Sequence, residues 1–149
     1  MGGAFGGKET QAVIPAVMVS LVASKTNRPA RIAYTKDDDM RSTGKRHPYK
    51  IHYKTAFTSK GKITGVRFDI YSNGGAAADL SGSVLERTLF HSDNAYYIPN
   101  LIFNGIICKT NFPPNTAFRG FGGPQGMANI ENVIQEISIY LQKDALEIR

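Results

Sequence analysis

Ala-Phe-Arg-Gly-Phe-Gly-Gly-Pro-Gln, residues 117–125, organises the whole chain, because it joins a rigid turn to a long helical pattern. A similar stretch, Gly-Gly-Ala-Phe-Gly-Gly-Lys-Glu at residues 2–9, opens the chain and also runs into a helical pattern. We refer to them as the second and the first glycine loop. Glycine costs backbone entropy, so a solvated loop gains little from this composition. The pattern favours a backbone that lies close to a flat or anionic ligand and offers it N–H groups. We therefore expect the two loops to form one site.

The hydrophobic periodicity around the loops predicts an α+β fold. Residues 8–25 form a helical pattern that is apolar over most of its circumference, which is typical of a deeply buried helix. Residues 48–58 and 62–71 alternate with a period of two about a tight turn, which predicts an antiparallel hairpin. A C-terminal helix with one apolar face is expected over residues 124–142. The other expected elements are a short strand at 31–35, a helical turn at 37–40, a helix at 79–89 that starts near Asp79 or Ser81, one or two further strands within 96–110, and a helix beginning at 146–149.

Composition narrows the classes of function. The 149 residues suffice for one domain with a real core. The net charge of +6 comes from dispersed lysines and arginines, the densest cluster being Arg41, Lys45 and Arg46, without the interleaved aromatics that stack on bases. We therefore expect a solvated basic face and no nucleic-acid partner. No apolar run approaches the roughly 20 residues that span a bilayer, so no membrane partner is expected. The single cysteine, Cys108, fits a buried thiol in a reducing compartment, which indicates the cytoplasm.

The first glycine loop comes close to a nucleotide-binding loop. Gly2, Gly7 and Lys8 occupy the positions of the Gly-x-x-x-x-Gly-Lys-Ser/Thr motif. Glu9, however, stands where the hydroxyl that binds magnesium is required, and a carboxylate there would repel phosphate. The Gly-x-Gly-x-x-Gly spacing of dinucleotide-binding folds is absent as well. Phosphate is therefore a poor ligand for this loop.

For four side chains, the sequence allows either a structural role or a ligand-binding role. Glu9 is either an acid that stabilises a helix start or a ligand contact. Arg87 is either a surface arginine or a cation in a site. Arg119 lies between loop residues where its side chain or amide could serve a ligand, and Phe121 fits a ligand pocket at least as well as a core.

Four segments together resemble the molybdenum-binding domain of the xanthine dehydrogenase and aldehyde oxidase superfamily, and its xanthine dehydrogenases above all. They are the first glycine loop, Tyr-Lys-Ile-His-Tyr-Lys at 49–54, Leu-Glu-Arg-Thr-Leu-Phe-His at 85–91, and the stretch from Cys108 to Gly126 that contains the second glycine loop. The resemblance covers essentially the whole chain. It implies that residues 1–149 are an N-terminal portion of the molybdenum domain of a larger enzyme, truncated at both ends.

The resemblance implies a cofactor side of the site. Phe5 and Gly6, together with the main chain of Arg119, would border molybdenum and its oxygen ligands. The cofactor would be molybdenum-molybdopterin, with its cytosine dinucleotide form left open. The 2Fe-2S clusters, FAD and NAD would lie on other domains or subunits, which would be the chain's partners together with the rest of the molybdenum domain. The family's catalytic base, a glutamate, lies in a segment outside these residues, so the isolated chain is expected to be inactive.

The resemblance also implies a substrate side. Phe121 would stack on a purine, Glu9 would hydrogen-bond its edge, and Arg87 would stabilise negative charge that develops on the ring oxygen. The expected reaction is hydroxylation of hypoxanthine or xanthine with oxygen from water. One alternative is a molybdenum hydroxylase for another N-heterocycle or an aldehyde; the resemblance implies that aldehyde oxidases tend to have uncharged residues at both positions. The other is a non-catalytic remnant or interaction module.

Overall fold

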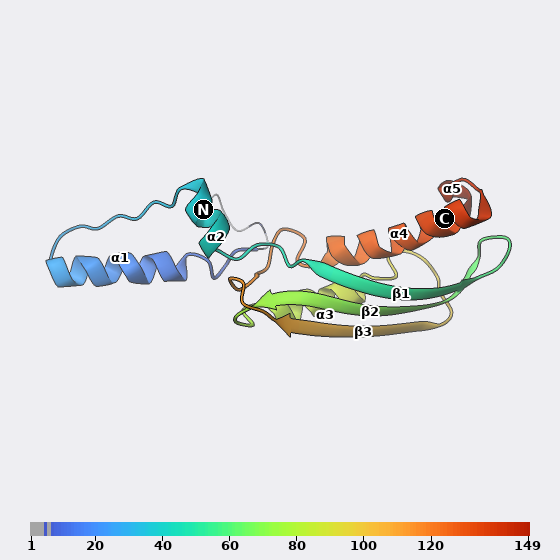
Figure 1. Ribbon diagram of the computed structural model, residues 1–149, viewed down its shortest axis with the longest axis horizontal. Coiled ribbons are helices and arrows are strands. Elements are labelled where there is room, and N and C mark those ends of the chain that lie inside the picture. Colours follow the sequence, from blue (N-terminus) through green and yellow to red (C-terminus); the bar gives the residue numbers. More distant parts are fainter. Residues whose placement is uncertain (1–4, 6) are drawn as a thin grey trace.

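A three-stranded mixed sheet forms the centre of the computed structural model, which describes residue 5 and residues 7–149. The strands β1 (Tyr49–Phe57), β2 (Ile63–Gly75) and β3 (Leu101–Lys109) follow one another in the order β1-β2-β3 (Figure 1). β1 and β2 form the predicted antiparallel hairpin, whereas β3 runs parallel to β2. A parallel pair needs a crossover, and helix α3 (Ser81–Phe90) supplies it. The α+β fold is thus confirmed.

One face of the sheet carries the core. Alternate residues of β2 point into it, and Phe68 stacks on Phe103 of the parallel neighbour with ring centroids 5.7 Å apart. Helix α3 contributes Leu85, and helix α4 (Gly123–Leu141) contributes apolar residues at helical spacing. Those of α4 are Ile130, Val133, Ile134 and Ile137, all buried. The predicted C-terminal helix is therefore confirmed within one residue at each end.

The N-terminal helix corrects an expectation. α1 (Val13–Thr26) forms, but none of its residues is buried, and Val17 and Leu21 are 61% and 55% exposed. It lies apart from the sheet (Figure 1). An apolar circumference predicts burial only where other elements surround the helix, and the described residues supply no such surroundings. The prediction of a buried helix is therefore wrong for this chain.

The segment between α1 and β1 differs in a similar way. Residues 31–35 have no strand assignment, because a strand exists through pairing and no neighbour pairs with them in the described part of the chain. The expected helical turn is present and longer, as α2 (Lys36–Ser42). It begins with a capping box in which Thr35 and Asp38 each satisfy the other's backbone N–H.

Two smaller predictions concern helix ends. α3 starts at Ser81, so the expected start near Asp79 or Ser81 is confirmed, although Leu80 is the N-cap and no side chain caps the helix. The last helix, α5 (Ala145–Ile148), is present, and the Asp144 side chain accepts a hydrogen bond from the amide of Leu146. Cys108 is half-buried on β3, less enclosed than expected.

Candidate functional site

The two glycine loops are neighbours, as the sequence predicts. The amide of Lys8 donates a hydrogen bond to the carbonyl of Ala117 at 2.8 Å. Gly7 lies so close to the second loop that a Cβ atom on it would be 2.6 Å from both the Ala117 oxygen and the Phe118 Cα. Only glycine permits this approach of two backbones. The junction of the two loops is therefore the centre of the candidate site.

The second glycine loop has an unusual backbone. Gly120, Phe121 and Gly122 all have left-handed conformations, with φ of 94°, 51° and 94°. Two hydrogen bonds hold this turn: the Phe121 amide donates to Phe118 oxygen at 2.7 Å, and the Gly123 amide donates to Gly120 oxygen at 3.0 Å. A non-glycine residue in this region costs energy and is common at functional sites. The constrained backbone therefore fixes the direction in which the half-buried Phe121 side chain leaves the main chain.

Helix α3 supports the second loop from one side. The Thr88 hydroxyl donates to the Gly122 carbonyl at 3.0 Å, and a Cβ on Gly122 would lie 2.7 Å from the same hydroxyl. At the preceding residue of α3, the Arg87 Nε lies 3.9 Å from where a Cβ of Gly123 would be. Arg87 is exposed, and it stands beside the positive N-terminal end of α4. The arginine and the helix end together favour negative charge at this place.

The residue after the first loop contacts the residues that precede α3. The Thr10 hydroxyl donates to Asp79 Oδ2 at 3.1 Å, just before α3 begins. Glu9, next to Thr10, is exposed and lies four residues before α1, so its predicted role as a helix-start acid is wrong. Phe5 has φ of 50° and a ring that is 70% exposed. Gly6 lies outside the described residues.

Arg46 contacts the second glycine loop, although the sequence did not single it out as a site residue. Its Nη2 donates to the Arg119 carbonyl at 2.7 Å, its Nη1 to Gln125 Oε1 at 3.4 Å, and its guanidinium lies 4.7 Å from the centre of the Phe118 ring. The expectation of a solvated basic face is therefore wrong for Arg46. No spacing in the sequence indicates these contacts, since 73 residues separate Arg46 from Arg119.

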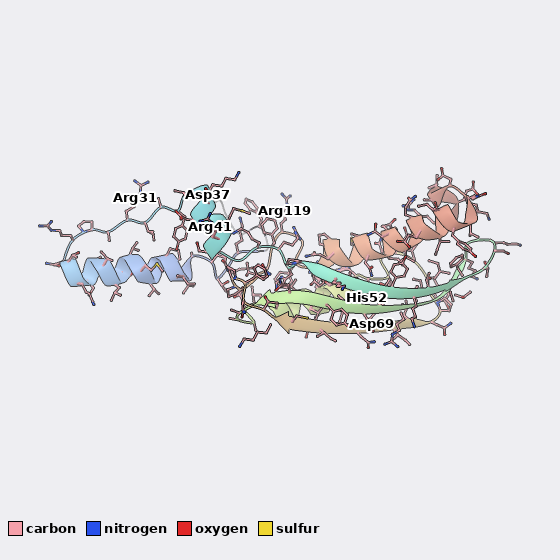
Figure 2. The ribbon with its side chains drawn as sticks, viewed as in Figure 1. Arg31, Asp37, Arg41, His52, Asp69 and Arg119 are labelled. Carbon is pink, nitrogen blue, oxygen red and sulfur yellow. The ribbon has the colours of Figure 1, made fainter. Side chains whose placement is uncertain are left out.

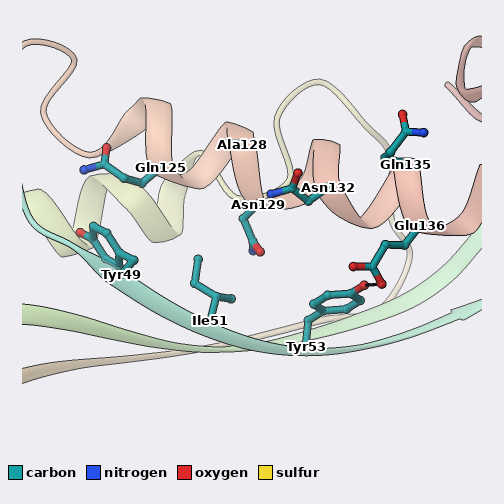
Figure 3. Close-up of a pocket in the computed structure, with 9 residues that line it drawn as sticks. All are labelled: Tyr49, Ile51, Tyr53, Gln125, Ala128, Asn129, Asn132, Gln135 and Glu136. Atoms are coloured by element: carbon teal, nitrogen blue, oxygen red, sulfur yellow. Dashed lines mark hydrogen bonds between the residues drawn. The ribbon is translucent and has the colours of Figure 1, made fainter.

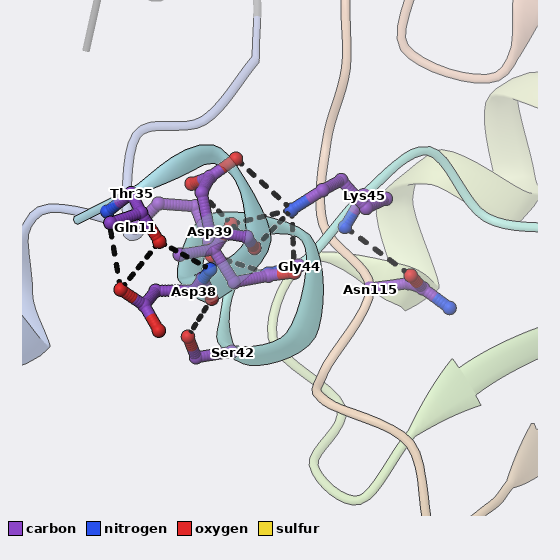
Figure 4. A network of polar contacts seen from close by, with 9 residues as sticks. Gln11, Thr35, Asp38, Asp39, Ser42, Gly44, Lys45 and Asn115 are labelled. Carbon is purple, nitrogen blue, oxygen red and sulfur yellow. Dashed lines mark hydrogen bonds and ion pairs between the residues drawn. The ribbon is translucent and has the colours of Figure 1, made fainter.

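Lys45 is engaged as well. Its ammonium donates to the Asp39 and Thr43 carbonyls at 2.8 and 3.0 Å and forms an ion pair with the Asp39 carboxylate (Figure 4). The hydrogen bond from Thr43 is the largest cause of a lowered Asp39 pKa, and Lys45 adds to it. This network fastens the end of α2 to the segment that leads to Arg46.

A buried histidine sits under the loops. His47 is 2% exposed, and its Nε2 is 2.6 Å from the Ser81 hydroxyl. Its Nδ1 is buried, with no hydrogen-bond partner in the described part of the chain. Burial lowers the pKa of His47, and the nearby Asp79 opposes this only in part. The ring is therefore a neutral part of the packing.

A separate groove of about 590 Å³ runs between β1 and α4 (Figure 3). Tyr53 and Glu136 face each other across it and are hydrogen-bonded, and burial together with this bond raises the pKa of Tyr53 to about 12. The Gln125 and Asn129 amide nitrogens are buried beside it, without a partner among the described residues. No candidate site residue lines this groove, so its size alone does not make it the site.

Neither a side-chain metal site nor a membrane-spanning helix is present among the described residues. They contain no group of three or more His, Cys, Asp or Glu side chains arranged to hold a metal ion. Within the same residues, no helix has the length and apolar character needed to cross a membrane.

Comparison with known proteins identifies the family. A family described as the molybdopterin cofactor-binding domain matches residues 1–149. The chain belongs to this family. It is 51% identical over 148 residues to xanthine dehydrogenase of Calliphora vicina and 49% identical over 149 residues to xanthine dehydrogenase/oxidase of Felis catus. These matches cover 99% and 100% of the chain but 11% of each relative's length.

Solved structures agree with the fold. The aldehyde oxidoreductase from Desulfovibrio gigas matches with a TM-score of 0.83 and 29% identity, over 99% of this chain and 16% of that one. Quinoline 2-oxidoreductase from Pseudomonas putida 86 matches with a TM-score of 0.81 and 22% identity, over 100% of this chain and 19% of the other. At that identity, the second likeness concerns the fold alone.

Proposed function

We propose that the chain forms two walls of the molybdenum and purine site of a xanthine dehydrogenase-type hydroxylase. The observation that carries the proposal is the junction of the glycine loops, where Lys8 is bonded to Ala117 while α3 presents Arg87 beside the start of α4. Identity of about half the residues with xanthine dehydrogenases over the full chain supports the same assignment. Residues 1–149 would then be an N-terminal portion of the molybdenum domain.

The loops fit an oxygen-rich cofactor. The peptide groups on both sides of Arg119 are anchored through their carbonyls, by the Phe121 amide and by Arg46. In a trans peptide the N–H points away from the C=O, so the amides of Arg119 and Gly120 are directed to the opposite sides of these anchors. The main chains of Phe5, Gly6 and Arg119 would border the bound cofactor. When bound, molybdenum-molybdopterin would accept the two electrons of a hydroxylation whose oxygen comes from water.

The side chains would act on the substrate. Phe121 would stack on the purine plane, and Glu9 would accept or share a proton at the purine edge. Arg87 would stabilise negative charge on the ring oxygen, helped by the positive end of α4. Preorganised donors of this kind are worth roughly 2.7–4 kcal/mol in comparable sites. Retention of both charged residues favours a purine over a substrate that lacks the purine edge.

The remaining components belong to the rest of the proposed enzyme. They are the glutamate base, the 2Fe-2S clusters, FAD and NAD, on other segments, domains or subunits. A cytoplasmic location and either form of the pterin are compatible with this proposal. The chain on its own should bind no molybdenum, because the loops provide only part of the cofactor's surroundings.

A second candidate is a molybdenum hydroxylase that acts on an aldehyde or another N-heterocycle. The fold similarity to an aldehyde oxidoreductase at 29% identity favours it. The two candidate functions differ in the roles of Glu9 and Arg87. In the purine proposal, Glu9 hydrogen-bonds the purine edge and Arg87 stabilises negative charge on the ring oxygen.

Substitution in the enzyme that carries these residues separates the two. We expect Glu9→Ala and Arg87→Met each to lower kcat/KM for xanthine by about 10²–10³ and to change aldehyde turnover far less. Matched controls are Glu147→Ala and Arg31→Met, which remove an exposed acid and an exposed arginine away from the loops. Unchanged xanthine turnover in both site variants would refute the purine assignment and favour the second candidate.

A further inference from the structure

Arg46 connects three parts of the second glycine loop. It donates to the Arg119 carbonyl, reaches the Gln125 side chain, and lies over the Phe118 ring. Lys8 of the first loop also lies over that ring, with its Nζ 5.7 Å from the centroid. The ring thus has cations from two separate segments near it, which suits the negative charge of an aromatic face.

The contact with Arg119 has a directional consequence. A planar peptide fixes the N–H of the following residue once its C=O is held. The bond from Arg46 to Arg119 oxygen, 2.7 Å long, therefore fixes the Gly120 N–H on the other side of the loop. Gly120 is in the left-handed region, and glycine has few steric limits there, so the peptide could rotate without this bond.

Arg46 itself is held in place by its own segment. The Gly44 amide donates to Gln11 Oε1 at 2.7 Å, and the Thr116 amide donates to Lys45 oxygen at 3.0 Å. Figure 4 shows Gln11, Gly44 and Lys45 close together, with Lys45 bonded to Asn115. The segment before β1 is therefore fastened both to the residues after the first loop and to those before the second.

We propose that Arg46 is a positioning residue, which sets the Arg119–Gly120 peptide so that the Gly120 N–H is aimed at an electronegative oxygen of the bound cofactor or substrate. This inference rests on the proposed function for the identity of the ligand, but not for the loop geometry. Lysine is a poor replacement, because a single ammonium cannot donate to Arg119 and Gln125 as a fork and lie flat on Phe118 as well.

The test compares Arg46→Met, Arg46→Lys and the control Arg31→Met in the enzyme that carries these residues. Arg31 is exposed and lies beside α1, well away from Arg119 (Figure 2). The first readout is hydrogen exchange of the amides at 118–123, which needs no activity. We expect exchange at least about tenfold faster in Arg46→Met, the factor for loss of one charge-assisted hydrogen bond, and an intermediate rate in Arg46→Lys.

The second readout is turnover per bound molybdenum. A purely structural role would lower the yield of folded, molybdenum-loaded enzyme and leave turnover per molybdenum unchanged. Positioning predicts a fall of about tenfold in kcat per molybdenum for Arg46→Met, with KM changed less. If Arg46→Met does not fold, Arg46→Lys decides by the same two readouts.

Two outcomes would overturn the inference: loop exchange equal to that of Arg31→Met, or unchanged turnover per molybdenum with faster exchange. A third separates it from the proposed function. If the parent enzyme ignores purines but oxidises another substrate, and Arg46→Met still speeds loop exchange and slows that turnover, the purine assignment fails and the role of Arg46 stands.

Discussion

Gly7→Ala tests the junction of the glycine loops. The new Cβ would lie 2.6 Å from the Ala117 oxygen and the Phe118 Cα, about 0.8 Å inside the 3.4 Å at which ordinary contact begins. Both atoms belong to the backbone, so no side chain can turn away and the loops must separate. Overpacking of this kind costs about 1–3 kcal/mol, and loss of the Lys8–Ala117 hydrogen bond adds about 0.5–1.5 kcal/mol. We expect the free energy of unfolding to fall by about 2–4 kcal/mol.

The assay is urea denaturation of the chain, followed by far-ultraviolet circular dichroism. Gly82→Ala is the matched control, because a Cβ there meets nothing within 4 Å and the residue lies in α3. That variant should be neutral or more stable by up to about 1 kcal/mol. A Gly7→Ala chain within about 0.5 kcal/mol of the wild type would show that the loops are not packed as described.

Three further predictions concern the support of the site. Thr88→Val leaves the Gly122 carbonyl with the Gly126 amide as its donor and without the hydroxyl, and should cost about 0.5–1.5 kcal/mol by the same denaturation; a neutral result would mean that α3 does not hold the loop. Burial lowers the pKa of His47, so the unfolded chain takes up the proton before the folded chain does, and the free energy of unfolding should fall as the pH drops below 6.5, by at most about 1.4 kcal/mol per pH unit. His47→Gln should remove this pH dependence. Parallel pH curves for the variant and the wild type would contradict the prediction. Leu21→Asp on the exposed helix α1 should lower the free energy of unfolding by less than about 0.5 kcal/mol, whereas Ile134→Ala in the core should lower it by about 2–5 kcal/mol. The reverse order would mean that α1 is packed in the chain.

Local patterns predicted most of the elements correctly. The hairpin, the crossover helix and α4 follow from periodicity and turn residues, which act over a few neighbouring positions. The strand expected at 31–35 failed because a strand depends on a pairing partner that local sequence does not specify. The burial of α1 failed for a related reason: its apolar surface indicates a partner, but the described residues do not provide one.

The site was predicted in part. Glycines around an aromatic residue indicated that the two loops form one site beside a ligand. The contact of Gly7 with Ala117 shows that the loops are neighbours, and the ligand stays a prediction. Arg46 was missed, because its role depends on contacts with residues more than 70 positions away. A dispersed basic cluster gives no sign of which member is turned inward. The roles of Glu9 and Arg87 stay predictions, since both are exposed in this chain.

The central claim is that the two glycine loops border the molybdenum of the proposed enzyme. The most direct measurement is an anomalous-scattering map at the molybdenum edge from crystals of the enzyme that carries these residues. We predict a peak at the loop junction, with the metal's oxygen ligands about 3 Å from main-chain amides at Phe5–Gly6 or Arg119–Gly120. A molybdenum peak away from both loops would contradict the account.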